Sequence, residues 1–283
     1  MGVSDRVQDT DWLELCRRAT DALRAILADN PSTAERVQEV GTRGEGGDRT
    51  LVIDADAEEA VFRELEALHH EGLRFTAVSE ERGTIDFGDP DVLVVVDPID
   101  GSVNAKRGLP HHAISIAVAG GPTMADVFFG YVYDFGPGEE WIARRGKGAW
   151  LNKRRLPAGA GERRGGDGRL ELLGIESADP RWVRDSAEAL AEQAYRLRAL
   201  GTMASTVCQV AAARLDGMVS LKRCRAVDVA AAQLIVREAG GFVAFPWFDD
   251  PLGAPLDIPP HSPIVAARTE ATLAQLAQIP PQP

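Results

Sequence analysis

Apolar residues recur with two different periods along the chain. Between residues 9 and 29 they follow i, i+3, i+4 spacing, which predicts an amphipathic helix that ends at Asn30-Pro31. A second helical pattern begins at Leu51, and its first turn is acidic, as the helix dipole favours. Val92–Val96 instead comprises five consecutive apolar residues, four of them β-branched, and predicts a strand buried on both faces.

Shorter patterns place the remaining elements and divide the chain into two halves. Strands are predicted at 75–78, 113–119, 127–133, 140–143 and 146–152. A Gly- and Arg-rich segment, 158–168, then predicts a surface loop and a domain boundary. Beyond it we expect strands at 170–174, 218–221 and 264–267 and helices at 182–193, 204–215, 229–240 and 269–277. These patterns predict an N-terminal α+β half, residues 1–157, and a C-terminal α/β half, residues 158–283, in a layered sandwich.

The glycine-rich segment Gly41–Asp48 is the one stretch of the first half that resists a regular assignment. It is not a Walker phosphate-binding loop, because no GxxxxGK[ST] motif follows a strand. We predict a mobile loop there, and the sequence leaves open whether it is an inert linker or a lid.

Composition narrows the class of protein. The chain has 283 residues, of which 45% are hydrophobic and 26% charged, as in globular proteins. Its net charge of −12 argues against nucleic-acid binding through a basic surface. We find neither a signal peptide nor an apolar stretch that could span a membrane. Three widely spaced cysteines, Cys16, Cys208 and Cys224, predict buried free thiols in a reducing compartment, and hence a cytoplasmic protein.

An acidic turn follows the most hydrophobic strand. The run Asp97-Pro98-Ile99-Asp100-Gly101-Ser102 brings two carboxylates together on a tight turn, and such hard oxygen donors suit Mg²⁺. The alternative is an Asx-type turn that merely caps a helix. Glu80 follows the strand at 75–78, and either a hairpin or a neighbouring-strand pairing with Val92–Val96 would bring Glu80 near Asp97. The sequence therefore suggests a metal site at this end of a sheet.

Four segments, in order, resemble the inositol monophosphatase family of Mg²⁺-dependent, lithium-sensitive sugar phosphatases. They are Ser79-Glu80-Glu81, Asp97–Asn104, Gly201–Ala204 and Asp228–Gly241. Further similarity to the archaeal branch, which has dual inositol monophosphatase and fructose-1,6-bisphosphatase activity, lies in Phe128–Tyr133 and Asn104–Pro110. The resemblance implies a five-layered αβαβα sandwich, a homodimer, and a small-molecule phosphate ester as the substrate.

The same resemblance implies two to three bound Mg²⁺ ions. Their ligands would be Asp54, Glu80, Asp97, the Ile99 carbonyl, Asp100 and Asp228. Asp97 would bridge the two stronger ions, and Asp54 with Glu80 would hold a third, weaker one. Asp54 is preferred to Asp56 because its register with the following residues matches the family pattern.

The expected reaction is hydrolysis of a sugar or cyclitol phosphate, such as inositol-1-phosphate or fructose-1,6-bisphosphate, by a metal-activated water. The expected catalytic residues are Asp54, Glu80 and Ser102. The backbone amides of Gly101 and Ser102 would cradle the phosphate, and no covalent phosphoenzyme is expected. The expected substrate-binding residues are Asp100, Gly101, Ser102, Arg198, Gly201, Thr202, Arg225 and Asp228, with the two arginines contacting a remote second phosphate.

Two other functions remain open on the sequence alone. The substrate could instead be 3′-phosphoadenosine 5′-phosphate or histidinol phosphate. A non-catalytic regulator is a rival of another class, since some family members bind transcription machinery. The complete set of carboxylates argues against a purely structural role, because clustered acids destabilise a fold without cations.

Overall fold

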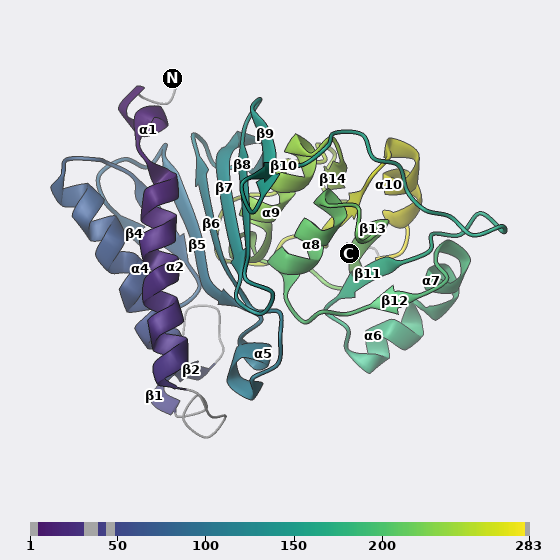
Figure 1. Ribbon diagram of the computed structural model, residues 1–283, viewed down its shortest axis with the longest axis horizontal. Helices are drawn as coiled ribbons and strands as arrows, with labels where there is room; N and C mark the ends of the chain where they lie inside the picture. The colour runs from purple at the N-terminus through teal and green to yellow at the C-terminus, as the bar shows by residue number, and fades with distance from the viewer. Residues whose placement is uncertain (1–4, 31–38, 44–48, 281–283) are drawn as a thin grey trace.

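Two sheets and three layers of helices alternate in this protein (Figure 1). The computed structural model describes residues 5–30, 39–43 and 49–280. An outer pair of helices covers one face of an eight-stranded sheet, and two buried helices separate that sheet from a five-stranded one. Three short helices cover the far face of the smaller sheet. This arrangement confirms the predicted αβαβα sandwich.

The first layer contains the two longest helices. They are α2 (Trp12–Asp29) and α4 (Val52–His70), preceded by the short α1 (Asp5–Asp9). Asp11 caps α2, since its carboxylate accepts a hydrogen bond from the Glu14 amide at 3.2 Å. The apolar face of each helix packs on the sheet, as the spacing predicted.

The eight-stranded sheet has the order β10-β9-β8-β7-β6-β5-β3-β4. Its strands are β3 (Thr76–Ser79), β4 (Gly83–Asp86), β5 (Leu93–Asp100), β6 (Ala113–Ala119), β7 (Val127–Asp134), β8 (Glu139–Arg144), β9 (Gly148–Leu151) and β10 (Arg154–Arg155). Of the two expected arrangements, the structure has neighbouring strands and not a hairpin, because β3 lies parallel to β5 with Ser79 opposite Val96. Residue 80 thus emerges at the same edge as Asp97.

Two helices form the buried middle layer, α8 (Met203–Ala211) and α9 (Ala226–Glu238). Small residues let α9 approach the larger sheet closely. Gly130 on β7 shows how close, since a Cβ atom there would lie 2.7 Å from the Ala231 carbonyl oxygen. A side chain at this position would therefore push the helix away from the sheet.

The five-stranded sheet has the order β12-β11-β13-β15-β14. Its strands are β11 (Leu173–Glu176), β12 (Leu197–Arg198), β13 (Gly217–Ser220), β14 (Phe242–Ala244) and β15 (Val265–Ala267). Its outer helices are α6 (Pro180–Asp185), α7 (Ala187–Gln193) and α10 (Glu270–Leu276). The larger sheet ends before residue 157 and the smaller begins after residue 158, while the domain boundary itself stays a prediction.

The structure differs from the sequence pattern in several segments, one of which is β4, where no strand was expected. Glu39–Arg43 (β1) pairs with Arg49–Leu51 (β2), so part of the segment expected to be a mobile loop is a strand. The remainder of that segment, 44–48, lies outside the described residues. The helix predicted at 182–193 is two helices that meet at Ser186, and the very short strands β12 and β14 had no sequence signal.

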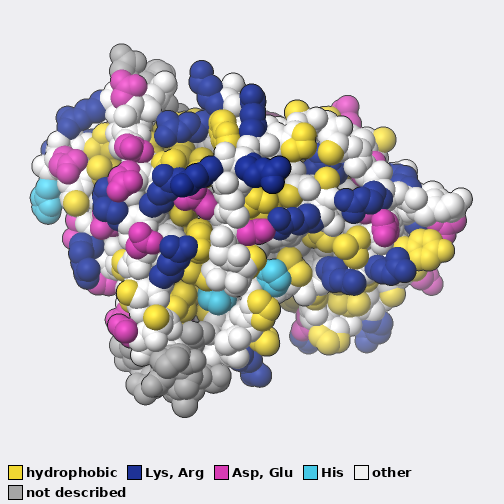
Figure 2. Space-filling model, viewed as in Figure 1, with side chains coloured by type: hydrophobic (Ala, Val, Ile, Leu, Met, Phe, Trp, Pro, Cys, Tyr) yellow, Lys and Arg dark blue, Asp and Glu magenta, His cyan; other side chains and the backbone are white. Residues whose placement is uncertain are grey.

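Basic and acidic side chains are mixed on the face of the molecule shown in Figure 2. The net charge of −12 therefore does not make this face uniformly acidic. In the part of the chain that the structure describes, no helix is long and apolar enough to cross a membrane. The three cysteines are buried and free, as predicted.

Candidate active site

Strand β5 continues through the acidic segment and ends at Asp100. We expected the strand to stop before Asp97, so this part of the prediction was wrong. A register shift between Asp97 and Asp100 interrupts the pairing with β6, and Pro98 lies inside the shift, where its missing N–H costs no ladder hydrogen bond. The irregularity places two carboxylates at one edge of the sheet.

Gly101 turns the chain from β5 into the short helix α5 (Ser102–Arg107). Its φ of 83° lies in the left-handed region, and a Cβ atom there would lie 2.9 Å from the Gly201 carbonyl oxygen. Glycine is therefore required for both conformation and space. The Asn104 side-chain amide donates to the carbonyls of His111 at 2.8 Å and Leu200 at 2.7 Å. These bonds tie α5 to the second half of the molecule.

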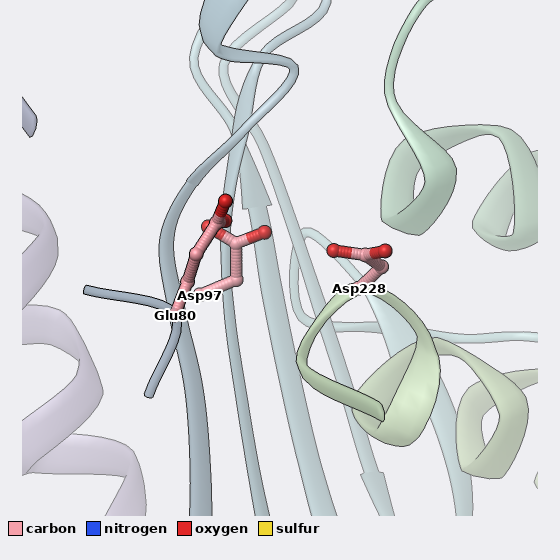
Figure 3. Close-up of side chains that lie close together, drawn as sticks. All are labelled: Glu80, Asp97 and Asp228. Atoms are coloured by element: carbon pink, nitrogen blue, oxygen red, sulfur yellow. The ribbon is translucent and has the colours of Figure 1, made fainter. Parts of the chain in front are cut away.

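Three carboxylates converge where β3, β5 and α9 end or begin (Figure 3). Glu80, Asp97 and Asp228 each offer an oxygen, and the three oxygens lie within 4.8 Å of one another. Glu80 follows β3, Asp97 lies on β5, and Asp228 faces them from the first turn of α9. Residues far apart in sequence thus form one acidic cluster.

Burial and nearby carboxylates disfavour the ionised forms of Glu80 and Asp97. Burial, followed by the charges of Glu80 and Asp100, raises the pKa of Asp97 well above its usual range. Burial also raises the pKa of Glu80 to about 7, an effect that Asp228 strengthens and Arg225 opposes. A divalent ion would relieve both penalties at once.

Arg225 supplies a positive charge inside the cluster. Its guanidinium donates to a carboxylate oxygen of Glu80 and, at 3.1 Å, to Asp228 Oδ1. Only 25% of its side chain is exposed. The prediction that Arg225 contacts a remote phosphate stays untested, and the guanidinium is engaged by two of the three converging carboxylates.

Asp100 lies beside the cluster but is held by α8. Its carboxylate accepts hydrogen bonds from the Thr202 hydroxyl and from the amides of Met203 at 3.1 Å and Ala204 at 2.6 Å. Burial and the charge of Asp228 raise its pKa to about 7, whereas the Thr202 bond opposes the rise. The segment Gly201–Ala204 is thereby brought directly to the acidic turn.

A cavity of about 30 Å³ opens beside Asp97 and Glu80. Its other lining residues are Asp54, Glu81, Pro98, Ile99, Ser102 and Lys106. Asp54 comes from the first turn of α4, while Asp56 is exposed to solvent. Lys106 lies 3.6 Å from Asp54, measured from Nζ to Oδ2. The structure thus gathers the predicted water-orienting residues, Asp54 and Ser102, in one pocket.

Arg198 is not part of that pocket. It lies on the edge strand β12, donates to the Leu197 carbonyl at 2.8 Å, and lines a different cavity of about 260 Å³ together with His111 and Arg214. The two cavities share no lining residue.

Three residues that line or support the site were not predicted from the sequence. Glu176 is buried and accepts from the Leu200 and Gly201 amides and the Thr206 hydroxyl, which fixes the approach to Thr202. Glu58, expected to be an ordinary first-turn acid, is buried against Ser79 at 2.6 Å. The sequence did carry a signal for Lys106. It lies four residues after Ser102 on the same helix, so the two side chains share one helix face.

The donor set fits a hard divalent cation. The converging ligands are all carboxylate oxygens, with neither His nor Cys among them, which is the chemistry that Mg²⁺ prefers. Burial, together with the neighbouring carboxylates, raises the pKa values of Glu80 and Asp97, so a bound cation would favour their ionised forms.

Comparison with known proteins places the chain in a class. The inositol monophosphatase family matches residues 9–280. The chain therefore belongs to the inositol monophosphatase family, whose members include phosphatases that act on small phosphate esters.

Individual relatives point to two kinds of protein within that family. A Thermococcus kodakarensis fructose-1,6-bisphosphatase/inositol-1-monophosphatase is 34% identical over 82% of this chain and 83% of its own. The Escherichia coli K12 Nus factor SuhB is 32% identical over 82% of this chain and 84% of its own.

Solved structures agree with the fold. The MJ0109 gene product, an inositol monophosphatase–fructose 1,6-bisphosphatase, superposes with a TM-score of 0.77 at 25% identity, covering 95% of this chain and 100% of that one. The extragenic suppressor protein SuhB from Bartonella henselae gives a TM-score of 0.76 at 28% identity, covering 95% and 98%.

Proposed function

We propose that this protein is a Mg²⁺-dependent phosphomonoesterase that hydrolyses a sugar or cyclitol phosphate. The observation that carries the proposal is the convergence of Glu80, Asp97 and Asp228 within 4.8 Å of one another, beside a cavity at the end of β5. When bound, two or three Mg²⁺ ions supply an activated water and neutralise the phosphoryl oxygens and the leaving alkoxide.

The chain's own residues would hold and orient these parts. Asp97, Glu80 and the Ile99 carbonyl would hold one ion. Asp97, Asp100 and Asp228 would hold another, and Asp100 is already fixed by its bonds to α8.

Two side chains of the cavity would manage the attacking water. Asp54 and Ser102 both line the cavity, and we assign them to orient the water and accept its proton. The amides of Gly101 and Ser102, where the chain turns into α5, would face the phosphate. Because the carboxylates serve as ligands, none is available as a nucleophile.

The substrates that we favour are inositol-1-phosphate and fructose-1,6-bisphosphate. Support comes from the archaeal relative, which bears both activities in its name and matches four-fifths of the chain. A panel of phosphate esters, assayed with and without Mg²⁺, tests this choice. Preference for 3′-phosphoadenosine 5′-phosphate or histidinol phosphate would redirect the substrate, and no hydrolysis with any ester would favour a regulator, as the similarity to SuhB allows.

A second phosphate would need a cation outside the metal cluster, and Arg198 is our candidate. It is exposed, and its guanidinium donates to the backbone carbonyl of Leu197. Arg198→Ala should lower kcat/KM for the bisphosphate much more than for the monophosphate. Arg181→Ala, which removes an exposed arginine already paired with Asp179, is the control. An equal loss of kcat/KM on both substrates would show that Arg198 does not contact the second phosphate.

We further propose that the enzyme is inhibited by lithium, forms a homodimer and is cytoplasmic. Lithium inhibition and the homodimer rest on the family resemblance, and the cytoplasmic location rests on the three buried free cysteines. Lithium titration of the Mg²⁺-activated reaction, sedimentation equilibrium and cell fractionation test them one by one.

A further inference from the structure

The cavity beside the acidic cluster contains a lysine close to the proposed third ion site. Lys106 lines this cavity together with Asp54, Glu80 and Ser102. Its ammonium nitrogen lies 3.6 Å from Asp54 Oδ2, and 21% of the lysine side chain and 11% of the aspartate side chain are exposed. The pair is therefore largely withdrawn from solvent. Opposite charges attract each other more strongly there than in water.

The helix that carries Lys106 is held in place by its neighbours. α5 starts at Gly101, whose left-handed conformation and close approach to Gly201 admit no other residue without strain. Asn104, two residues before Lys106, holds the helix through bonds to His111 and Leu200. Lys106 also lies one helical turn after Ser102, and both side chains line the cavity.

Asp54 differs from the three converging carboxylates in how its charge is met. It does not belong to the group formed by Glu80, Asp97 and Asp228. Its negative charge already has an ammonium partner from the protein. A divalent ion placed between Asp54 and Glu80 would lie beside that ammonium and be repelled by it.

We propose that Lys106 takes the place of the third metal ion in this protein. On this inference, which rests on the proposed function, the chain binds two divalent ions. The Lys106 ammonium supplies the third positive charge of the site, holds Asp54 toward the water and faces the substrate phosphate. Lys106 is then a positioning residue that also lowers the requirement for Mg²⁺.

The test counts bound ions directly. Mn²⁺ binding to the purified full chain is measured by equilibrium dialysis and by the loss of the free-Mn²⁺ electron paramagnetic resonance signal. We expect two ions per wild-type chain. Lys106→Met, which keeps the length of the side chain and removes its charge, should take up a third ion at least roughly tenfold more tightly than the wild type does.

Two further variants separate charge from other effects. Lys106→Arg keeps the charge and should still bind two ions. Arg107→Met removes the next cation on the same helix, which is exposed and does not line the cavity, and should also bind two. Thermal melting of each variant checks that the fold is intact.

The outcomes distinguish this inference from the proposed function. Three ions in the wild type together with ester hydrolysis, or two ions in a folded Lys106→Met variant, would overturn the role of Lys106 and leave the phosphatase standing. No Mn²⁺ bound to the wild type would overturn both.

Discussion

Two buried acidic sites in this molecule differ in how their charge is satisfied. At the end of the larger sheet, Glu80, Asp97 and Asp228 converge, and Arg225 contacts Glu80 and Asp228. The neighbouring carboxylates add to the effect of burial in raising the pKa of Asp97. In the smaller sheet, the single carboxylate of Glu176 accepts two backbone amides and the Thr206 hydroxyl.

Burial alone therefore does not identify a functional carboxylate. Burial raises the pKa of Glu176 too, but hydrogen bonds from Thr206 and the backbone oppose the rise. The cluster around Asp97 instead gathers three carboxylates within 4.8 Å of one another, and such a group could hold a metal ion. Glu176 has its donors within the fold and serves to position Gly201 and Thr202.

The largest expected effect is the loss of phosphatase activity when the cluster around Asp97 is changed. Asp97→Asn removes a carboxylate shared between the proposed ions, so phosphatase turnover should fall by orders of magnitude while the fold survives. Steady-state kinetics with Mg²⁺, alongside circular dichroism, measure both. Turnover near that of the wild type in a folded variant would contradict the assignment of Asp97 to the metal site.

The next effect concerns stability without metal. Glu176→Ala leaves two amides and a hydroxyl without their acceptor, and each unsatisfied buried donor costs about 1–3 kcal/mol. We expect a loss of about 3 kcal/mol or more in urea unfolding in the absence of Mg²⁺. Asp97→Asn, in contrast, should not destabilise the metal-free protein, because it relieves repulsion. A metal-free Asp97→Asn variant as unstable as Glu176→Ala would contradict the comparison.

Mg²⁺ should stabilise the folded protein through the cluster of Glu80, Asp97 and Asp228 and not through Glu176. An ion that binds the folded chain at one hundred times its Kd adds about 2.7 kcal/mol. The melting temperature of the wild type and of Glu176→Ala should rise with Mg²⁺, and that of Asp97→Asn should rise much less. Equal shifts in all three proteins would place the bound Mg²⁺ elsewhere.

The smallest effect concerns the supporting acid Glu58, whose pKa burial raises from 4.5 to about 7. The folded state thus binds this proton more tightly than the unfolded chain. Stability is complete below about pH 4.5 and falls as pH rises toward 7. Glu58→Gln should therefore stabilise the protein by about 1–2 kcal/mol at pH 8 and hardly at all at pH 4.5.

Chemical unfolding of Glu58→Gln at the two pH values measures this difference. The exposed neighbour Glu59, changed to Gln, serves as the control and should show no such pH dependence. A stabilisation by Glu58→Gln that is the same at both pH values would indicate improved packing and not the loss of a buried charge.

Periodicity and motif spacing determined much of this protein in advance. The helices α2 and α4 and the strand β5 follow from local patterns, because burial of one helix face leaves a periodic trace and burial of both strand faces leaves an apolar run. That β3 lies next to β5 was one of two arrangements that the sequence allowed. The placement of Glu80 beside Asp97 followed from that pairing.

Only the tertiary structure decided which charges meet. Arg225 joins Glu80 across 145 residues, and Asp100 reaches Thr202 across 102. Glu176 and Glu58 had no local signal, since an acid in a helix or at a strand end is usually solvated. Such contacts depend on how the layers stack and how closely α5, α8 and α9 approach one another, and periodicity within a segment carries no record of its distant neighbours.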